Sequence, residues 1–232
     1  TFGPEEIKGW IDSLNFKADG QTVSWSLDPA NIDIAILKLN TPLASGQRVK
    51  ISTPFKVKIP SGSISRLGHI GQSYQITQWY PKPAVFDKDG WHAMPYLNQG
   101  EFYSEFGTFD VRISVPKNYV IGATGELKTK SEIDFLSERA NYSASTPLDE
   151  ITFDSISSNE YKTLHFRQAN LHDFAWFGQK DFMVLKDSVE LPNSKRSVNT
   201  WAYFDKANYK EWKGVPRYIN QAVYHYSKYN GD

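Results

Sequence analysis

Apolar and polar residues alternate along much of the chain with the period of two that is typical of strands. In the clearest run, four apolar residues from Phe109 to Val115 alternate with three polar ones. Shorter runs of the same kind lie within residues 14–59, where Asp19-Gly20 predicts a tight turn between two strands. The pattern predicts a chain built mainly of short strands.

A helical pattern is clear only near the C-terminal end of the sequence. Val215, Ile219, Ala222, Val223 and Tyr226 recur at positions i, i+4, i+7, i+8 and i+11. That spacing places them on one face of a helix. Residues 128–150 are polar and without a period, which indicates irregular structure. The expected fold class is therefore mainly β, a saddle-like β-sandwich followed by a helix at about 215–229.

The composition of the chain bears on its possible binding partners, but it says little about catalytic chemistry. Among 232 residues, 26 Lys and Arg balance 26 Asp and Glu. This balance removes the electrostatic argument for nucleic acid, which we do not expect as a partner. No apolar run reaches the roughly 20 residues of a transmembrane helix. The sequence opens at Thr1 without an initiator Met, and we expect it to be a fragment.

Aromatic residues gather between positions 74 and 109, and two interpretations of them stay open. Exposed rings would stack on sugars, as in a carbohydrate-binding module, whereas inward rings would form the core of a sandwich. Since large exposed apolar patches are unusual, we expect the core. The ten residues are Tyr74, Trp79, Tyr80, Phe86, Trp91, Tyr96, Phe102, Tyr103, Phe106 and Phe109.

The chain contains no complete catalytic or metal-binding motif. The spacing His-Glu-x-x-His, which places two imidazoles on one helix face, does not occur at any of the five histidines. His172-Asp173 is a tempting acid–base pair, but neighbouring residues on a strand point to opposite faces. We therefore interpret His172 as structural. We predict no catalytic residue and no metal ligand in this chain.

An ordered series of short motifs nevertheless resembles a known family. The series is Gln78-Trp79-Tyr80-Pro81-Lys82, Gly90-Trp91-His92, Glu101-Phe102, Phe109-Asp110-Val111, Ala123-Thr124-Gly125 and His172-Asp173-Phe174-Ala175-Trp176. It is similar to the N-terminal portion of the aminopeptidase N and leukotriene hydrolase family of zinc metallopeptidases, in its bacterial branch. The resemblance covers nearly the whole chain.

This resemblance implies a domain order and a cofactor. Residues 1–168 would be the N-terminal β domain without its first strands, and residues 169–232 would begin the thermolysin-like catalytic domain. The family's zinc motif and its Gly-x-Met-Glu-Asn motif do not occur here. We therefore expect zinc in the intact protein but no cofactor bound by this fragment, which should be inactive alone. The family's habit suggests secretion or the periplasm, although no residue indicates a compartment.

The resemblance also supplies candidate site residues. In the family, the loop that begins with the glutamine of this motif reaches over the active site and lines the first substrate pocket. Gln78 and Tyr80 are accordingly the main pocket candidates, although Tyr80 lacks the charge that many relatives place there. An alternative role for Gln78 is a hydrogen bond that fixes the loop. Secondary candidates are Trp79, Trp91, His92 and Glu101.

Three hypotheses of function follow from these observations. The first is the non-catalytic N-terminal portion of a zinc aminopeptidase that hydrolyses peptides, with the peptide substrate and its own catalytic domain as partners. The second is an aromatic-rich β-sandwich that binds carbohydrate or protein. The third is an inactive family member that serves as a scaffold. We also expect self-association of the fragment, since unpaired sheet edges and an uncovered helix face promote association.

Overall fold

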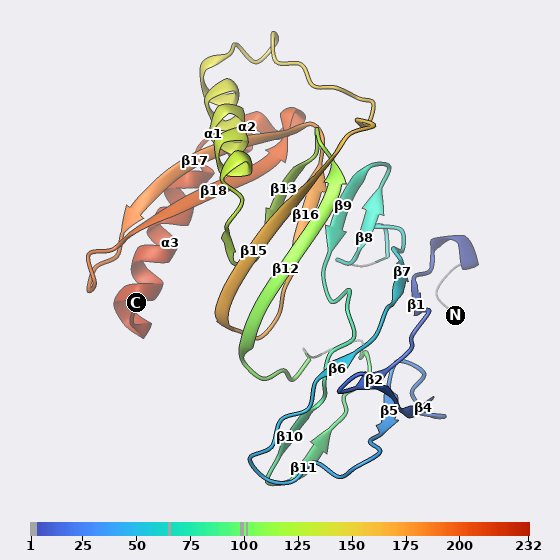
Figure 1. The fold of residues 1–232 in the computed structure, drawn as a ribbon. Helices are drawn as coiled ribbons and strands as arrows, with labels where there is room; N and C mark the ends of the chain where they lie inside the picture. Colours follow the sequence, from blue (N-terminus) through green and yellow to red (C-terminus); the bar gives the residue numbers. More distant parts are fainter. Residues whose placement is uncertain (1–3, 65, 98–99, 101) are drawn as a thin grey trace. The chain divides into compact units, whose positions relative to one another are not determined.

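The computed structural model describes residues 4–64, 66–97, 100 and 102–232. Over this part the chain is mainly β, with 37% strand and 19% helix, arranged in several antiparallel sheets (Figure 1). The predicted mainly β class is confirmed. The saddle-like sandwich and the start of a thermolysin-like domain stay predictions.

The chain folds into two compact units, each built from segments that are distant in sequence. Unit 1 comprises Thr1–Ile70, Gln75–Gly107 and Ala169–Ala175. Unit 2 comprises Gly71–Tyr74, Thr108–Gln168 and Trp176–Asp232. The domain boundary that we expect at residue 168 stays a prediction.

Unit 1 consists of short strands joined by tight turns. In one of these turns, Asp19 and Gly20 both adopt positive φ, +48° and +84°, between β2 and β3. This is the backbone that a two-residue hairpin turn requires, and the prediction from Asp19-Gly20 is confirmed. The elements are η1 (Glu5–Ile7), β1 (Trp10–Asp12), β2 (Lys17–Ala18), β3 (Gln21–Thr22), β4 (Ser24–Leu27), β5 (Ala35–Lys38), β6 (Ile51–Ser52), β7 (Lys56–Lys58), β8 (Gly68–Ile70), β10 (Val85–Asp87) and β11 (Gly90–His92), with β9 (Ser73–Ile76) shared by both units.

Unit 2 combines longer strands with the helices. The predicted alternating run lies in β12, where Ile113 and Val115 are buried and the intervening Ser114 is exposed. Strand β15 pairs with β12 and β14 in a three-stranded sheet, and β13 pairs with β16. The elements are β12 (Gly107–Pro116), β13 (Val120–Ala123), β14 (Glu126–Leu127), α1 (Lys130–Ser145), β15 (Tyr161–Leu171), β16 (Trp176–Gln179), β17 (Phe182–Glu190), β18 (Ser197–Asp205), η2 (Lys206–Asn208), α2 (Tyr209–Trp212) and α3 (Val215–Asn230).

The core of unit 2 lies on both faces of the long β17–β18 hairpin. On one face, Val184 packs with Leu136 and Ala140 of α1. On the other face, Met183 and its neighbours on β18 pack with residues that include Val215 and Ile219 of α3. Successive residues of a strand point to opposite faces, so this one hairpin serves two helices.

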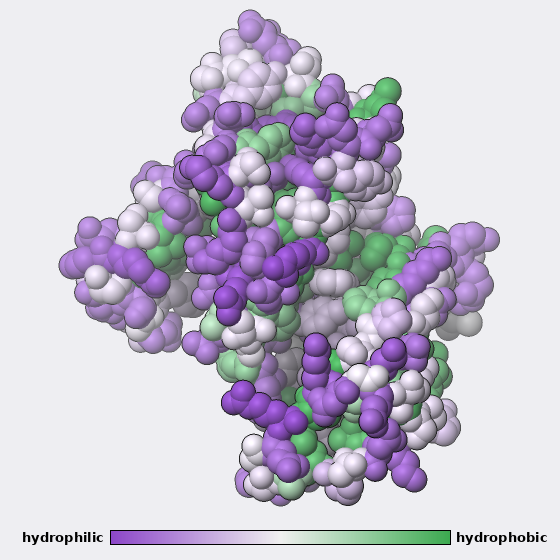
Figure 2. Space-filling model, in the orientation of Figure 1, coloured by the Kyte–Doolittle hydropathy of each residue, from purple (hydrophilic) through white to green (hydrophobic). Residues whose placement is uncertain are grey.

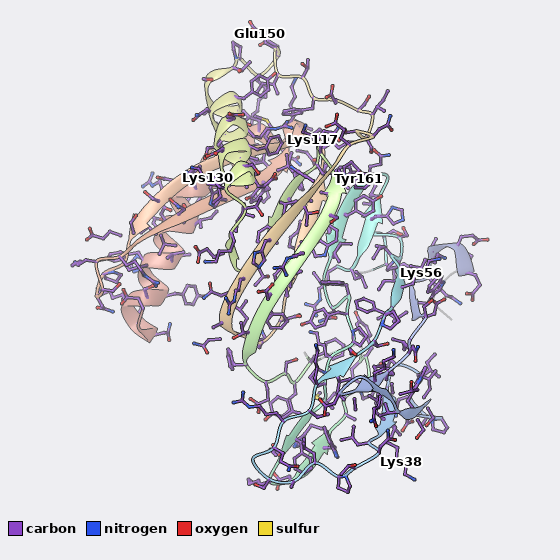
Figure 3. The ribbon with its side chains drawn as sticks, in the orientation of Figure 1. Lys38, Lys56, Lys117, Lys130, Glu150 and Tyr161 are labelled. Carbon is purple, nitrogen blue, oxygen red and sulfur yellow. The ribbon has the colours of Figure 1, made fainter. Side chains whose placement is uncertain are left out.

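The two long helices show what the spacing of apolar residues can and cannot predict. Helix α3 spans Val215–Asn230, as the apolar spacing predicts. Helix α1 corrects the expectation of irregular structure in 128–150 (Figure 3 labels its first residue, Lys130, and Glu150 in the connection that follows). It was missed because its buried stripe is half polar. The stripe consists of Glu132, Leu136, Ala140 and Ser143.

Lys180 is buried and Lys162 is partly buried in unit 2, and the two are held in different ways. Lys162 of β15 donates from Nζ to Glu132 Oε1 at 2.7 Å, and its ammonium lies 4.0 Å from the ring centre of Phe135. Lys180, which is 6% exposed, donates instead to neutral oxygens. These acceptors are Gln72 Oε1, the Ser155 carbonyl and Ser157 Oγ.

The expectation that the aromatic cluster forms a core is wrong. None of its ten members is buried, and Phe86, Trp91, Tyr96, Tyr103 and Phe106 are exposed. Phe86 and Trp91 lie on the β10–β11 hairpin, whose two strands pair only with each other in the described part of the chain. A two-stranded sheet offers little surface on which large rings can be buried.

Across the described residues, no helix has the length and apolar character needed to cross a membrane.

Candidate functional site

The segment 77–82 joins β9 to β10 in unit 1, and its backbone is unusual at Gln78. This residue has φ of +51°, a left-handed conformation that is uncommon for a side chain other than glycine. Such a conformation costs on the order of 1 kcal/mol and persists only where the surrounding structure holds it. The fixed left-handed turn sets the direction in which the Gln78 side chain leaves the backbone.

Three side chains hold the segment on its C-terminal side. The indole Nε1 of Trp79 donates to the Phe174 carbonyl at 3.1 Å. The Tyr80 hydroxyl donates to Asp173 Oδ1 at 2.9 Å. Lys82 Nζ forms an ion pair with the same oxygen at 2.8 Å. Segment 78–82 is thus bound to residues 173–174, more than 90 positions away in the sequence.

Asp173 is the centre of this network. Its Oδ1 accepts a third hydrogen bond, at 2.7 Å, from the backbone N–H of Phe174. Burial is the main cause that raises the pKa of Tyr80, and the negative charge of Asp173 adds to it. The Tyr80 phenol therefore stays protonated at neutral pH and acts as a donor. The side chains of Lys82 and Asp173 are 19% and 28% exposed, so the ion pair lies partly within the protein.

Aromatic rings surround the ion pair. The Lys82 ammonium lies 5.4 Å from the ring centre of Tyr80 and 5.7 Å from that of Phe102. The rings of Trp79 and Tyr80 meet edge to face at 5.3 Å, and Phe55 lies 6.0 Å from Trp79. A cation over aromatic faces is attracted by their quadrupoles. Within the residues that the structure describes, the site is thus an aromatic wall around the matched charges of Lys82 and Asp173.

Two polar side chains, Thr77 and Gln78, lie at the start of the segment. The Thr77 hydroxyl is buried and has no hydrogen-bond partner within the described residues. The half-buried Gln78 side chain likewise makes no hydrogen bond to the described part of the chain. This argues against the alternative role of Gln78 as a residue that fixes the loop. Unsatisfied polar groups at a strained turn are typical of binding sites.

Trp91 and His92 lie on the β10–β11 hairpin and have partners of their own. Trp91 is 71% exposed, and its ring lies 5.0 Å from that of the cross-strand residue Phe86. His92 Nε2 lies 2.8 Å from Asp87 Oδ1, and this hydrogen bond is the main cause that lowers the pKa of Asp87. The His92 ring also meets Tyr103 edge to face at 5.3 Å. Within the described residues, no hydrogen bond or ring contact joins this hairpin pair to Asp173.

The structure groups the predicted candidates unequally. It brings Trp79 and Tyr80 together in the network, places Gln78 at its strained start, and gives Trp91 and His92 partners of their own on and beside the hairpin. Glu101 lies outside the described residues. Lys82 and Asp173 were not among the site residues predicted from the sequence. Their signal was present, since both belong to motifs that carry the family resemblance.

His172 behaves as a structural residue. Its ring packs edge to face against Phe106 at 5.7 Å, while the next side chain, Asp173, contacts Tyr80 and Lys82. The two neighbours therefore have separate partners, although the chain bends at His172, just after β15, and is not a strand there.

The donor set of the site does not fit a metal ion. Among the described residues of the site, Asp173 is the one carboxylate, and it is already paired with Lys82. In the regions that the structure covers, no three His, Asp or Glu side chains converge as metal ligands would. We therefore place no zinc site in the described part of the chain.

Comparisons of the chain with protein-family models, with curated proteins and with solved structures gave no significant match.

Proposed function

We propose that this chain is the non-catalytic N-terminal portion of a zinc-dependent aminopeptidase-like metallopeptidase. In this role Gln78 and Tyr80 form part of the wall of the first substrate pocket. The metal chemistry would come from residues beyond those described here, and the described residues would supply architecture and substrate contacts. Residues 1–232 alone would then hydrolyse no peptide.

The observation that supports this proposal most is the link between two separate family-like motifs. Gln78-Trp79-Tyr80-Pro81-Lys82 and His172-Asp173-Phe174-Ala175-Trp176 both belong to the series of motifs that carries the family resemblance. In the fold, the first is bound to the second by two hydrogen bonds and an ion pair. Contact between distant segments is what one expects if both motifs shape one site.

The geometry also agrees with a contact role for Gln78. Its backbone is held in a costly conformation, yet its amide is unused within the described residues. An amide offers two N–H donors and a carbonyl acceptor, so it can bind a peptide group from either side. Because the strained backbone of Gln78 supports no side-chain contact within the described residues, we favour a role of this side chain in binding a ligand.

The test is peptidase activity of the natural full-length protein that carries this chain. We expect it to hydrolyse aminoacyl-4-nitroanilides and to lose this activity when a chelator removes its metal. Gln78→Ala should raise KM about tenfold and change kcat by less than about twofold, as loss of uniform substrate binding does. Gln75→Ala is the matched control, because Gln75 is an exposed glutamine of the preceding strand β9.

Two results would overturn the proposal. One is a full-length protein that hydrolyses no aminoacyl substrate although it folds and contains its metal. The other is turnover by residues 1–232 alone that persists in the presence of a chelator.

A second candidate function rests on the exposed aromatic hairpin. Phe86 and Trp91, 63% and 71% exposed, lie side by side on β10–β11, and Figure 2 shows apolar residues interspersed with polar ones on the drawn face. Their rings are inclined by 57°, whereas stacking on a sugar needs a flat platform. The hairpin therefore favours a protein partner over carbohydrate. Tryptophan fluorescence that changes on addition of cellulose, chitin or xylan oligosaccharides would reverse that preference.

A further inference from the structure

Within the described residues, the charges of Lys82 and Asp173 cancel each other in an otherwise aromatic wall. Lys82 and Asp173 are 2.8 Å apart, and each side chain is less than one-third exposed. Three donors converge on Asp173 Oδ1, namely Lys82 Nζ, the Tyr80 hydroxyl and the Phe174 N–H. The pair is thus fixed in place, and the described residues of the site present no net charge to a ligand beside it.

We propose that the Lys82–Asp173 pair determines the charge selectivity of the site for the first side chain of a peptide. As paired, the two residues leave a neutral aromatic wall that accepts apolar and aromatic side chains and disfavours charged ones. This inference rests on the proposed function, because it places the first residue of a peptide beside Gln78 and Tyr80. Lys82 and Asp173 are specificity-determining residues, and neither takes part in the chemical step.

The physical reason is the cost of an uncompensated charge in a partly desolvated place. A charged substrate side chain that enters the site loses water and meets a pair whose attraction and repulsion nearly balance. Removing one member of the pair exposes the other as a fixed, partly buried charge. The site then attracts a side chain of opposite sign, because Coulomb interactions are stronger near the protein than in bulk water.

Two substitutions change the charge with little change of shape. In Asp173→Asn, the amide oxygen can still accept hydrogen bonds from Tyr80 and from the Phe174 N–H. In Lys82→Met, an apolar unbranched chain still packs between the rings of Tyr80 and Phe102. The combined variant carries neither charge and restores a neutral wall.

The experiment measures binding and hydrolysis side by side in the full-length protein. Isothermal titration with Leu-Gly-Gly, Glu-Gly-Gly and Lys-Gly-Gly gives the relative affinities, and the matching aminoacyl-4-nitroanilides give kcat/KM. The unmodified protein should prefer the Leu ligand. Asp173→Asn should improve Glu relative to Leu about tenfold, and Lys82→Met should improve Lys relative to Leu by a similar factor.

The combined variant and a surface control separate charge from structure. The combined variant should return the ratios to within about threefold of the unmodified protein, which a merely structural role would not do. Lys88→Met, at the exposed pair of Lys88 with Asp89 on the hairpin turn, should leave all ratios unchanged.

The two proposals fail in different ways. Charge-dependent shifts in binding without any hydrolysis would support this inference and overturn the proposed function. Hydrolysis with the same Leu, Glu and Lys ranking in all variants would overturn this inference and support the proposed function. Loss of binding for all three ligands in equal measure would show a structural role and would also overturn the inference.

Discussion

Replacing Lys162 with Met should destabilise unit 2 through the carboxylate that it leaves behind. The Glu132 side chain, on the buried face of α1, is 4% exposed, and Lys162 is its one hydrogen-bond donor within the described residues. Breaking a buried ion pair by removing one partner costs about 3–5 kcal/mol. The loss of the cation over the Phe135 ring acts in the same direction.

Protonation of Glu132 limits the loss of stability and makes that loss depend on pH. Burial already raises the pKa of Glu132, against the opposing effect of Lys162. Without Lys162 the carboxyl group can take up a proton, which at pH 7 costs about 3.7 kcal/mol from an ordinary pKa of about 4.3. The folded variant then binds one proton more than the unfolded chain. Its stability must therefore rise as the pH falls, by about 1.4 kcal/mol per pH unit.

Urea unfolding followed by tryptophan fluorescence measures this difference. We expect Lys162→Met to lower the free energy of unfolding by about 3–4 kcal/mol at pH 7 and by only about 1 kcal/mol at pH 5. The control is Lys117→Met, which removes the exposed pair of Lys117 with Glu160. That loss should stay below about 1 kcal/mol at both pH values.

A loss below about 1 kcal/mol at pH 7, or one that is the same at both pH values, would refute this reasoning. The combined variant Glu132→Leu and Lys162→Met tests the same reasoning by removing both charges. Because neither charge is then buried, stability should recover to within about 1 kcal/mol of the unmodified chain or exceed it.

Three further predictions concern single residues. Gln78→Gly should raise the free energy of unfolding by about 1 kcal/mol in urea titrations, because glycine adopts positive φ without strain. Ligand binding should weaken in the same variant. A loss of stability would contradict this prediction. Lys180→Met should change the free energy of unfolding by less than about 1 kcal/mol, because the oxygens that accept from Lys180 can bind water instead. It should nevertheless speed proteolytic cleavage within residues 146–160. Unchanged cleavage would show that Lys180 does not hold this connection. Trp79→Phe should lower the free energy of unfolding by about 1–2 kcal/mol, because it removes the hydrogen bond to the Phe174 carbonyl. Trp91→Phe, at an exposed position, should lower it by less than about 0.5 kcal/mol, as measured by thermal unfolding. Equal losses in the two variants would argue against the anchoring role of Trp79.

Elements whose buried face is apolar were predictable from the sequence. The run from Phe109 to Val115 forms β12, and the spacing of Val215 and Ile219 identifies α3, because in both cases the apolar side chains face the core. Helix α1 was not predictable in this way. Its buried positions include Glu132 and Ser143, whose polar groups are satisfied by Lys162 and by the Val184 N–H. Such partners come from distant strands and leave no local pattern.

The candidate site was predictable only in part, for a similar reason. Gln78 and Tyr80 belong to a contiguous motif, and the motif could be recognised. The role of Asp173 depends on contacts more than 90 residues away, which no local rule gives. The exposure of Trp91 likewise depends on how many strands pair beside it. Burial is a property of the assembled fold, so aromatic residues alone were a poor guide to the core.

The long β17–β18 hairpin has a consequence for the order in which the protein folds. Its nine residue pairs and the two helices packed on it come from one continuous stretch, residues 130–230. Contacts that are close in sequence close small loops, and they form at a low entropic cost. The bonds of Tyr80 and Lys82 to Asp173 close loops of more than 90 residues. We expect the hairpin and its helices to form first and the site last, so that in native-state hydrogen exchange the amides of segment 77–82 open well before those of β17.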